Sequence, residues 1–506
     1  MKTLTIVFFF ILWGIFASFG QELTPDKNYK VPTSDYEYAR TKSWIEDDID
    51  SGYHHASAAA IEAFRDIKYG VRIHWGLYSI NGQGNTSWPF LNLSYEQKQA
   101  YNEMYKSWNP TGFDAEEWME LFKENGIKMF AITAIHHEGF SMFDTKTRVK
   151  KRVNWIAPGG PALEDCDLAY SIMETPFHRD VIKELCNAGH KYGLKIDLYY
   201  SHPNFYNADY RPYFHPLTFP LAKEHPELYG DHDCLKENAI VVSNPTPEEE
   251  FRMMAYHRQQ ITELLTNYGK IDMICFDLCL GKKVWPQMRK EMKDYRKIQP
   301  DVMFRARGIG NYGDYYTPEG FVPGNKANTD MPWFVIYPYG KWFSYVKNDQ
   351  FKGASWIISN LCDIVAKGGN FMIGIGPDAT GRFDPRVISA IKEAGAWLKI
   401  NGEAIYATRP REGNFWKEND SIRYTRTKDK QTIYAISLVW PGKLLKLKTV
   451  EPKKGSEIFL LGWGKPLEWK YNKEEGLKIS LPAELQDKSK RPCRMAWSFK
   501  ITPAVN

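Results

Sequence analysis

The sequence predicts an α/β protein in which a (β/α)8-like barrel of the TIM type precedes an antiparallel β-sandwich. Short apolar segments and amphipathic segments alternate at least six times between residues 69 and 399, as is typical of strands and helices around a parallel sheet. Polar and aromatic residues cluster in the loops that follow the strands, which favours a barrel over an open sheet. From about residue 411, short alternating segments separated by turn residues predict the sandwich.

Local patterns place the elements of the barrel in order. Short apolar runs predict strands at 69–80, 129–135, 194–201, 271–281, 302–308 and 371–377. Helical spacing and end signals predict helices at 57–66, 94–125, 179–192, 246–268, 286–297, 351–366 and 384–399. The segment from Thr246 begins TPEEE, with a capping Thr, a Pro in the first turn and acids placed against the helix dipole. Residues 144–176 and 331–346 are expected to be irregular.

Composition excludes several classes of protein. The chain of 506 residues has a net charge of +5, and its Lys and Arg residues form no long basic run, so no nucleic-acid partner is expected. Aromatic residues make up 15% of the chain, and their rings suit sugar faces as well as a core. The seven Cys residues form no CxxC pair, which predicts neither a disulfide framework nor a zinc site. Cys275 and Cys279 are expected to be buried thiols, and no cofactor is expected.

The chain is expected to divide into three segments. Residues 1–20 combine a Lys, a short apolar core and small residues, which is the pattern of a signal peptide cleaved near Gly20. We therefore expect an exported protein, periplasmic or secreted, with no membrane association after cleavage. The barrel domain is expected over residues 21–410 and the β-sandwich over residues 411–506. The sequence leaves the oligomeric state open.

The main candidate for a catalytic residue is Asp277, which ends the apolar part of the run IDMICFDLCLG at residues 271–281. A carboxylate at the C-terminal end of a parallel strand lies at the edge of a barrel or sheet where ligands bind. We interpret Asp277 as a nucleophile and much of the chain as a frame that presents a sugar to it.

Other strand ends carry polar or aromatic side chains. These are His74, His136, His137, Tyr199, Tyr200 and Arg307. Two interpretations of the histidines compete: they bind zinc together with Asp277, or they form hydrogen bonds to sugar hydroxyls as neutral imidazoles. Adjacent residues on a strand point to opposite sides, and neither HxH nor HExxH occurs, so the sequence favours the sugar-binding interpretation.

Glycoside hydrolysis requires two carboxyl groups that flank the scissile bond. Asp277 fits the ionised group, which Arg307 is placed to keep ionised. Glu319, in a Gly-rich loop, fits the group that holds a proton for the leaving oxygen. In a retaining enzyme the two carboxyl groups are about 5–5.5 Å apart.

Longer stretches resemble the α-L-fucosidases of glycoside hydrolase family 29. They run in order over residues 64 to 410 and include YGVRIHWGLYS, WNPTGFDAEEW, ITAIHHEGFSMFDTKT, HRDVIKELCNAGHKYGLKIDLYYS, NYGKIDMICFD, QPDVMFRARG, GDYYTPE and GGNFMIGIGPDATGRFDPRVISAIKEAGAWLKINGEAIYAT. HWGLYS, the HHEGF segment and the INGEAIY tail occur together, so the chain resembles a divergent, bacterial member of this family.

The resemblance implies a barrel followed by a β-sandwich, and a retaining double displacement without a metal. It implies release of terminal α-L-fucose from fucosylated oligosaccharides or glycoconjugates. Asp277 matches the nucleophile of the family, and Glu319 matches the acid/base of similar members. The matched sugar contacts are His74, Trp88, His136, His137, Arg307 and one of Tyr199 and Tyr200, of which Tyr200 is preferred.

Three positions depart from the family pattern. Ser87 stands before Trp88 where many members have an acid, Ala306 replaces an Asp, and Phe334 replaces a Glu. These changes leave two alternatives open. One is a related α-L-glycosidase such as an α-L-galactosidase, because a pocket that tolerates an added hydroxyl discriminates only roughly a hundredfold. The other is an inactive carbohydrate-binding homologue, against which the presence of Glu319 as well as a nucleophile counts.

Overall fold

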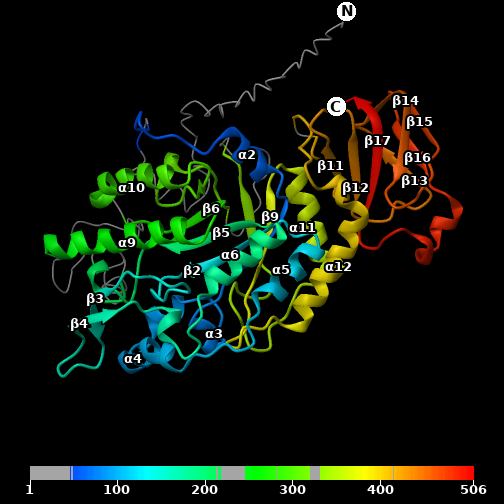
Figure 1. Cartoon of the computed structure of the whole chain (residues 1–506). Helices are drawn as coiled ribbons and strands as arrows, with labels where there is room; N and C mark the ends of the chain where they lie inside the picture. The colour runs from blue at the N-terminus through cyan, green and yellow to red at the C-terminus, as the bar shows by residue number, and fades with distance from the viewer. Residues whose placement is uncertain are drawn as a thin grey trace, which may run out of the picture.

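The computed structural model describes residues 46, 49–211, 215–217, 246–280, 282–318, 331–413 and 415–505. The predicted signal peptide at residues 1–20 and the predicted acid/base Glu319 lie outside these residues. None of the helices among the described residues is long and apolar enough to cross a membrane. The described chain forms a large α/β part followed by a smaller all-β part, as Figure 1 shows.

A curled sheet of seven parallel strands forms the centre of the α/β part, which confirms the predicted fold class. The strands lie in the order β7-β6-β5-β2-β1-β9-β8, so chain neighbours are also sheet neighbours except at the open edge. Their bounds are β1 Tyr69–Ile73, β2 Met129–Ile135, β5 Lys195–Ser201, β6 Met273–Asp277, β7 Met303–Phe304, β8 Phe334–Pro338 and β9 Asn370–Ile375.

The gap between β7 and β8 is bridged by a short segment rather than by a strand. Tyr315 forms an isolated parallel bridge with Arg305, and Tyr316 forms one with Trp333. These two bridges continue the hydrogen-bonded ring from β7 to β8. The two edges of the seven-stranded sheet are therefore linked through this segment by single bridges, beside the strand that precedes Arg307.

Helices surround the sheet (Figure 1), at the predicted positions except for α3, which lies where the strand predicted at 69–80 was expected to continue. Their bounds are α2 Ala58–Arg65, α3 Tyr78–Asn81, α4 Tyr95–Glu103, α5 Ala115–Glu124, α6 Val181–Tyr192, α9 Pro247–Asn267, α10 Trp285–Ile298, α11 Ala354–Ala366 and α12 Pro385–Asn401. Side-chain caps fix several of their starts. The Ser57 hydroxyl accepts from the Ala60 N–H at α2, and Thr246 and Glu249 form a reciprocal capping box at α9.

Two hydrophobic clusters hold the sheet. The cluster on its inner side is rich in methionine, an adaptable side chain that fills irregular space. It contains Met129, Ala131, Met273, Met303, Phe334 and Met372. The larger cluster lies between the outer face of the sheet and the helices. There Gly189 lets α6 approach β2 closely, because a Cβ at this position would lie 2.6 Å from the Phe130 ring.

The structure corrects several expectations. Residues expected to form a loop contain an antiparallel hairpin, β3 Val149–Asn154 and β4 Ala162–Leu168, and β8 lies in a segment expected to be irregular. The β8 residues pair with β9 and are buried at Phe334, so tertiary pairing overrides the mixed aromatic pattern. Cys279 is disulfide-bonded rather than a free thiol, whereas Cys275 is free and buried as expected.

The C-terminal part consists of two antiparallel sheets. The larger has the order β10-β11-β12-β17-β14 and the smaller β13-β16-β15. Their bounds are β10 Lys417–Glu418, β11 Ile422–Arg426, β12 Ile433–Ser437, β13 Leu444–Leu447, β14 Glu451–Leu460, β15 Trp469–Asn472, β16 Gly476–Ser480 and β17 Trp497–Val505. Residues of both sheets, such as Leu447 and Phe499, share one hydrophobic cluster, as in a sandwich.

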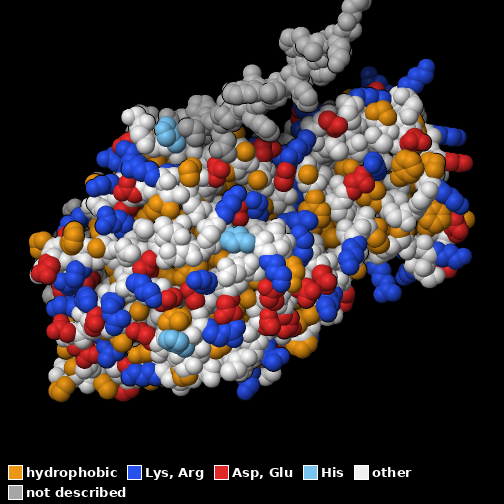
Figure 2. Space-filling model, in the orientation of Figure 1, with side chains coloured by type: hydrophobic (Ala, Val, Ile, Leu, Met, Phe, Trp, Pro, Cys, Tyr) orange, Lys and Arg blue, Asp and Glu red, His pale blue; other side chains and the backbone are white. Residues whose placement is uncertain are grey.

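Both signs of charge are distributed over the surface. On the face in Figure 2, Lys and Arg side chains are interspersed with Asp and Glu side chains over the barrel and the C-terminal sheets. This face therefore carries no extended surface of one sign of the kind that attracts a polyanion.

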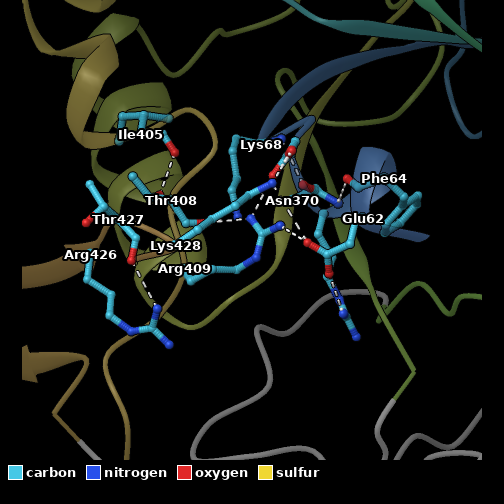
Figure 3. A network of polar contacts seen from close by, with 12 residues as sticks. Glu62, Phe64, Lys68, Asn370, Ile405, Thr408, Arg409, Arg426, Thr427 and Lys428 are labelled. Carbon is cyan, nitrogen blue, oxygen red and sulfur yellow. Dashed lines mark hydrogen bonds and ion pairs between the residues drawn. The ribbon is translucent and has the colours of Figure 1, made fainter. Parts of the chain in front are cut away.

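A polar network joins the start of the barrel to the chain that leads into the C-terminal sheets (Figure 3). Arg409 Nη1 lies 2.7 Å from Asp66 Oδ1, and Arg409 also forms an ion pair with Glu62. Lys428 Nζ lies 2.7 Å from Asp66 Oδ2. Nearby, the Asn370 side chain accepts from the Lys68 N–H, which links this network to β9.

We expect Arg409→Ala to lower the free energy of unfolding at neutral pH by about 1–2 kcal/mol, because it leaves two carboxylates without their shared cation. Partial burial raises the pKa of Glu62, but Arg65 and Arg409 hold it at about 2. The lost stabilisation is therefore fully present above the pKa of an unfolded Glu, and it disappears as the pH falls below that value and through the folded pKa of about 2. Chemical unfolding of both proteins at neutral and acidic pH measures the difference.

Lys428→Ala is the matched control, because the Lys428 side chain is 47% exposed whereas that of Arg409 is 15% exposed. It should cost less than about 0.5 kcal/mol. Equal losses in the two variants would show that Arg409 does not organise the network.

Candidate active site

Asp277 is the last residue of β6 and lies at the C-terminal end of the parallel sheet. Its backbone is held from β5, because Ser201 is its register partner and the His202 N–H donates to its carbonyl over 3.0 Å. The chain then turns sharply, since Leu278 has a left-handed φ of 56°. Strand and turn together fix the direction of the Asp277 side chain.

Four side chains surround the Asp277 carboxylate. Arg307 Nη1 donates to Oδ1 over 2.7 Å, and Arg305 Nη1 donates to the same oxygen over 3.3 Å. The Tyr199 hydroxyl donates to Oδ2 over 2.6 Å, and His137 Nε2 lies 3.5 Å from Oδ2. The carboxylate is thus oriented through both of its oxygens.

This environment keeps Asp277 ionised. Burial raises its pKa, but Arg307, His137 and Arg305 together hold the pKa well below the usual value for Asp. Asp277 nevertheless retains 9% exposure, so the carboxylate is not sealed off. An ionised, oriented and reachable carboxylate is what nucleophilic attack on a sugar requires.

A cavity of about 170 Å³ opens at Asp277. It is lined by Arg72, His74, Asn85, Thr86, Trp88, His136, Tyr199, Asp277, Arg305, Ile336 and Phe343. These residues come from β1, β5, β6, β8 and the segments that follow β1, β2, β7 and β8, so the cavity lies at the ligand-binding end of a barrel. Its lining combines ionic, aromatic and apolar side chains, which suits a small polar ligand with one apolar face.

The histidines predicted from the sequence gather at this cavity. His74 and His136 line it, and His137 lies behind Asp277 with the Trp88 ring at 4.7 Å between centroids. Burial lowers the pKa of all three, to about 3 for His136. They are therefore neutral at ordinary pH and able to donate or accept hydrogen bonds without carrying charge.

The structure corrects the choice between the two tyrosines. The Tyr200 hydroxyl donates to Gln260 on α9 over 2.9 Å, so the Tyr200 side chain lies on the outer face of the sheet, away from Asp277. The Tyr199 ring stacks on His136 with centroids 5.3 Å apart, while its hydroxyl contacts the carboxylate. Tyr199, not Tyr200, therefore belongs to the cavity.

We expect Tyr199→Phe to lower kcat/KM at least about tenfold, because the variant loses a hydrogen bond to an ionised carboxylate. Tyr200→Phe is the matched control and should change kcat/KM by less than about threefold. Steady-state kinetics with an aryl glycoside that the wild type hydrolyses compares the two. A larger effect of Tyr200→Phe would contradict the placement of these rings.

Several site residues were missed by the sequence analysis. Arg72 on β1 lines the cavity and pairs with Asp197 on β5 at 2.8 Å, and Arg305 contacts Asp277 beside Arg307. The two-residue spacing of Arg305 and Arg307 was a usable signal, because alternate residues of an extended chain face the same way. Phe343 had no comparable signal, since it belongs to a loop that β8 and β9 bring to the cavity.

The three positions that depart from the family pattern differ in whether they touch the cavity. Ala306 and Phe334 are fully buried in the inner core of the sheet and do not line the cavity. Ser87 contacts a cavity residue directly, because its Oγ lies 2.5 Å from His136 Nδ1. Among the described residues, no group of three or more His, Cys, Asp or Glu side chains is placed to hold a metal ion.

Comparison with known proteins gives one consistent result. The family model for alpha-L-fucosidase matches residues 50–403, and the model for the alpha-L-fucosidase C-terminal domain matches residues 417–502. The tissue alpha-L-fucosidase of Homo sapiens is 27% identical over 475 residues, covering 87% of this chain and 88% of that protein.

Solved structures show the same similarity. Alpha-L-fucosidase isoenzyme 1 from Paenibacillus thiaminolyticus has a TM-score of 0.69 at 25% identity, covering 88% of this chain and 98% of that one. An alpha-L-fucosidase from Bacteroides thetaiotaomicron has a TM-score of 0.70 at 22% identity, covering 90% and 99%. The second structure supports the fold of both the barrel and the C-terminal sheets.

Proposed function

The chain belongs to the α-L-fucosidase family of glycosidases, and from that premise we propose that it is an exo-acting, retaining hydrolase that releases terminal α-L-fucose from glycans by double displacement. The observation that carries the proposal is the ionised Asp277 at the floor of a cavity lined by neutral histidines and aromatic rings. Related structures include one described as a complex with fucose and one described as a trapped covalent intermediate.

In the first step, an Asp277 oxygen attacks the anomeric carbon. A carbon–oxygen bond forms to the carboxylate, the glycosidic bond breaks, and the leaving oxygen takes a proton from Glu319. Arg305 and Arg307 keep Asp277 ionised before attack, and the Tyr199 hydroxyl orients Oδ2. The product of this step is a fucosyl ester of Asp277.

In the second step, Glu319 takes a proton from water, and the water oxygen attacks the same carbon. The ester bond breaks, and Asp277 returns as a carboxylate to the two arginines that stabilise it. Two inversions at one carbon give net retention of configuration. Neutral His74 and His136 are placed to form hydrogen bonds to the sugar hydroxyls throughout, because neither changes charge at working pH.

The cavity supports binding of a single terminal sugar. Trp88, Ile336 and Phe343 supply apolar surface in its wall, which suits the methyl group and C–H face of a 6-deoxy sugar. We accordingly propose fucosylated oligosaccharides or glycoconjugates as natural substrates. The signal-like pattern at residues 1–20 supports export of the enzyme to such substrates.

Two measurements on the wild-type chain test the proposal. We expect kcat/KM for an aryl α-L-fucoside to exceed that for the matching α-L-galactoside, and NMR of the first-formed product to show α-L-fucose. Preference for the galactoside would identify the chain as an α-L-galactosidase. Appearance of β-L-fucose first would exclude double displacement, and binding without turnover would identify a carbohydrate-binding homologue.

A further inference from the structure

One buried carboxyl group at the cavity has no part in the proposed reaction. Glu138 is only 3% exposed, and its Oε2 lies 3.6 Å from Nδ1 of His136. Ser87 Oγ lies 2.5 Å from the same nitrogen. Two oxygen-bearing side chains thus face one nitrogen of a residue that lines the cavity, and Glu138 Oε2 forms no hydrogen bond within the described chain.

Local structure holds Glu138 in this place. The segment from His136 to Gly139 is a tight turn in which the Gly139 N–H donates to the His136 carbonyl and Gly139 has a φ of 81°. Gly76 leaves room for the carboxyl group, because a Cβ there would lie 2.9 Å from Glu138 Oε1. The turn and the glycine together direct the carboxyl group back toward the imidazole.

The partner of Nδ1 decides which nitrogen of a neutral imidazole carries the proton. Burial lowers the pKa of His136 to about 3, so the ring holds one proton and not two. A carboxylate only accepts hydrogen bonds, so an ionised Glu138 near Nδ1 favours a proton on Nδ1. Nε2, which has no hydrogen-bond partner in the part of the chain that the structure describes, is then an acceptor.

We propose that Glu138 is a positioning residue for the hydrolysis: together with Ser87 it keeps the His136 proton on Nδ1, so that Nε2 accepts a hydrogen bond from a sugar hydroxyl. This inference rests on the proposed function, because it assigns the role of one contact to the bound sugar. Ser87, which replaces an acid of many family members, is thus one of the two side chains that control how His136 binds a sugar hydroxyl.

The position of the proton on His136 depends on pH through Glu138. Burial raises the pKa of Glu138 to about 7, although its own backbone N–H, Ser87 and His137 lower it. The titratable groups that face it are His136, His137, Tyr78, Tyr101 and Tyr170. Burial keeps the tyrosines protonated and the histidines neutral, so Glu138 is the member of this cluster that titrates near neutrality.

Protonation makes Glu138 a hydrogen-bond donor and reverses the arrangement. Glu138 gains one proton from solvent and no longer attracts a proton on Nδ1 of His136. The Ser87 hydroxyl, 2.5 Å from Nδ1, then donates to that nitrogen, and the imidazole proton moves to Nε2. The charge of His136 does not change, because it holds one proton in both states. The sugar hydroxyl then meets a donor instead of an acceptor.

Nitrogen NMR of the full chain tests this assignment directly, because the two imidazole nitrogens give separate signals with and without a proton. The protein is labelled with nitrogen-15 histidine, and the His136 signals are identified by their loss in His136→Gln. In the wild type we expect Nδ1–H at about pH 8.5 and a shift toward Nε2–H at about pH 5.5. One unchanged tautomer over this range would overturn the proposal without reference to any variant.

Glu138→Gln should abolish the pH dependence, because an amide does not titrate in this range. Glu263→Gln is the matched control: Glu263 is also a buried glutamate, but its carboxylate accepts from the Thr145 hydroxyl, whereas Glu138 faces His136. We expect it to keep the wild-type response. A Glu138→Gln protein that still changes tautomer with pH would also overturn the proposal.

Binding of α-L-fucose measures the consequence for the sugar. Its dissociation constant in the wild type should change about fivefold between these pH values, on the scale of one hydrogen bond, and should stay constant in Glu138→Gln. Absence of both fucose binding and α-L-fucoside turnover in the wild type would reject the proposed function, while the NMR result still decides the tautomer. Binding with identical pH profiles in both proteins would reject the positioning role alone.

Discussion

Asp277→Ala should lower kcat for an aryl α-L-fucoside by about 10⁴-fold or more, because it removes the atom that attacks the anomeric carbon. The three side chains Arg305, Arg307 and Tyr199 remain to bind an anion in its place. Added azide should therefore restore turnover of a substrate with a good leaving group. One inversion at the anomeric carbon makes β-L-fucosyl azide the expected product.

The control for this experiment is Asp272→Ala. Asp272 immediately precedes β6, so it lies at the opposite end of the strand, where it pairs with Lys195 at 2.7 Å. Loss of this carboxyl group should leave kcat within about threefold of the wild type. Undiminished turnover by Asp277→Ala would exclude it as the nucleophile and with it the reaction proposed here.

Glu319→Gln should lower kcat/KM by about 10²- to 10⁴-fold for substrates with poor leaving groups, because these need a proton on the departing oxygen. Substrates with very good leaving groups should still form the fucosyl ester, so that loss of the ester limits turnover. Azide should then accelerate turnover, since it attacks without general base assistance. Two inversions make α-L-fucosyl azide the expected product.

The two azide products distinguish the two roles within one assay. Formation of the β-azide by Asp277→Ala and the α-azide by Glu319→Gln assigns one residue to attack and the other to proton transfer. Pro318 precedes Glu319 and Gly320 follows it, so neither adjacent position offers a substitute carboxyl group. If Glu319→Gln retains wild-type kcat/KM for poor leaving groups, the acid/base is therefore a carboxyl group from another segment of the chain.

The sequence was sufficient for the barrel because its signals are local and repeated. Every strand of the parallel sheet except β8 was predicted, and the Thr246 cap of α9 was recognised from five residues. The hairpin at 149–168 was missed because its strands are rich in charged residues, and the strand at 334–338 because it lies in an aromatic stretch without alternation. Each becomes a strand only when its partner is present. The disulfide at Cys279 depends on spatial proximity, which spacing in the chain does not report.

Single site residues at strand ends could be predicted from the sequence, whereas contacts between residues of different strands could not. Asp277, His74, His136 and Arg307 follow apolar runs, which marks them without any knowledge of their partners. To choose between Tyr199 and Tyr200, one must know which alternate residues of β5 point to the inside of the barrel. Asp197 is two residues before Tyr199 and faces Arg72 inside the sheet, so alternation along the strand would have selected Tyr199.

The joint between β7 and β8 has a consequence for how this enzyme can change over time. Only the bridges of Tyr315 and Tyr316 span it within the described chain, whereas β6 is flanked by continuous pairing with β5. Substitutions at Tyr315 and Tyr316 therefore affect only isolated bridges and leave the pairing of the strand that carries Asp277 unchanged. The residues of this joint can thus change during evolution while the backbone that presents Asp277 is inherited unchanged.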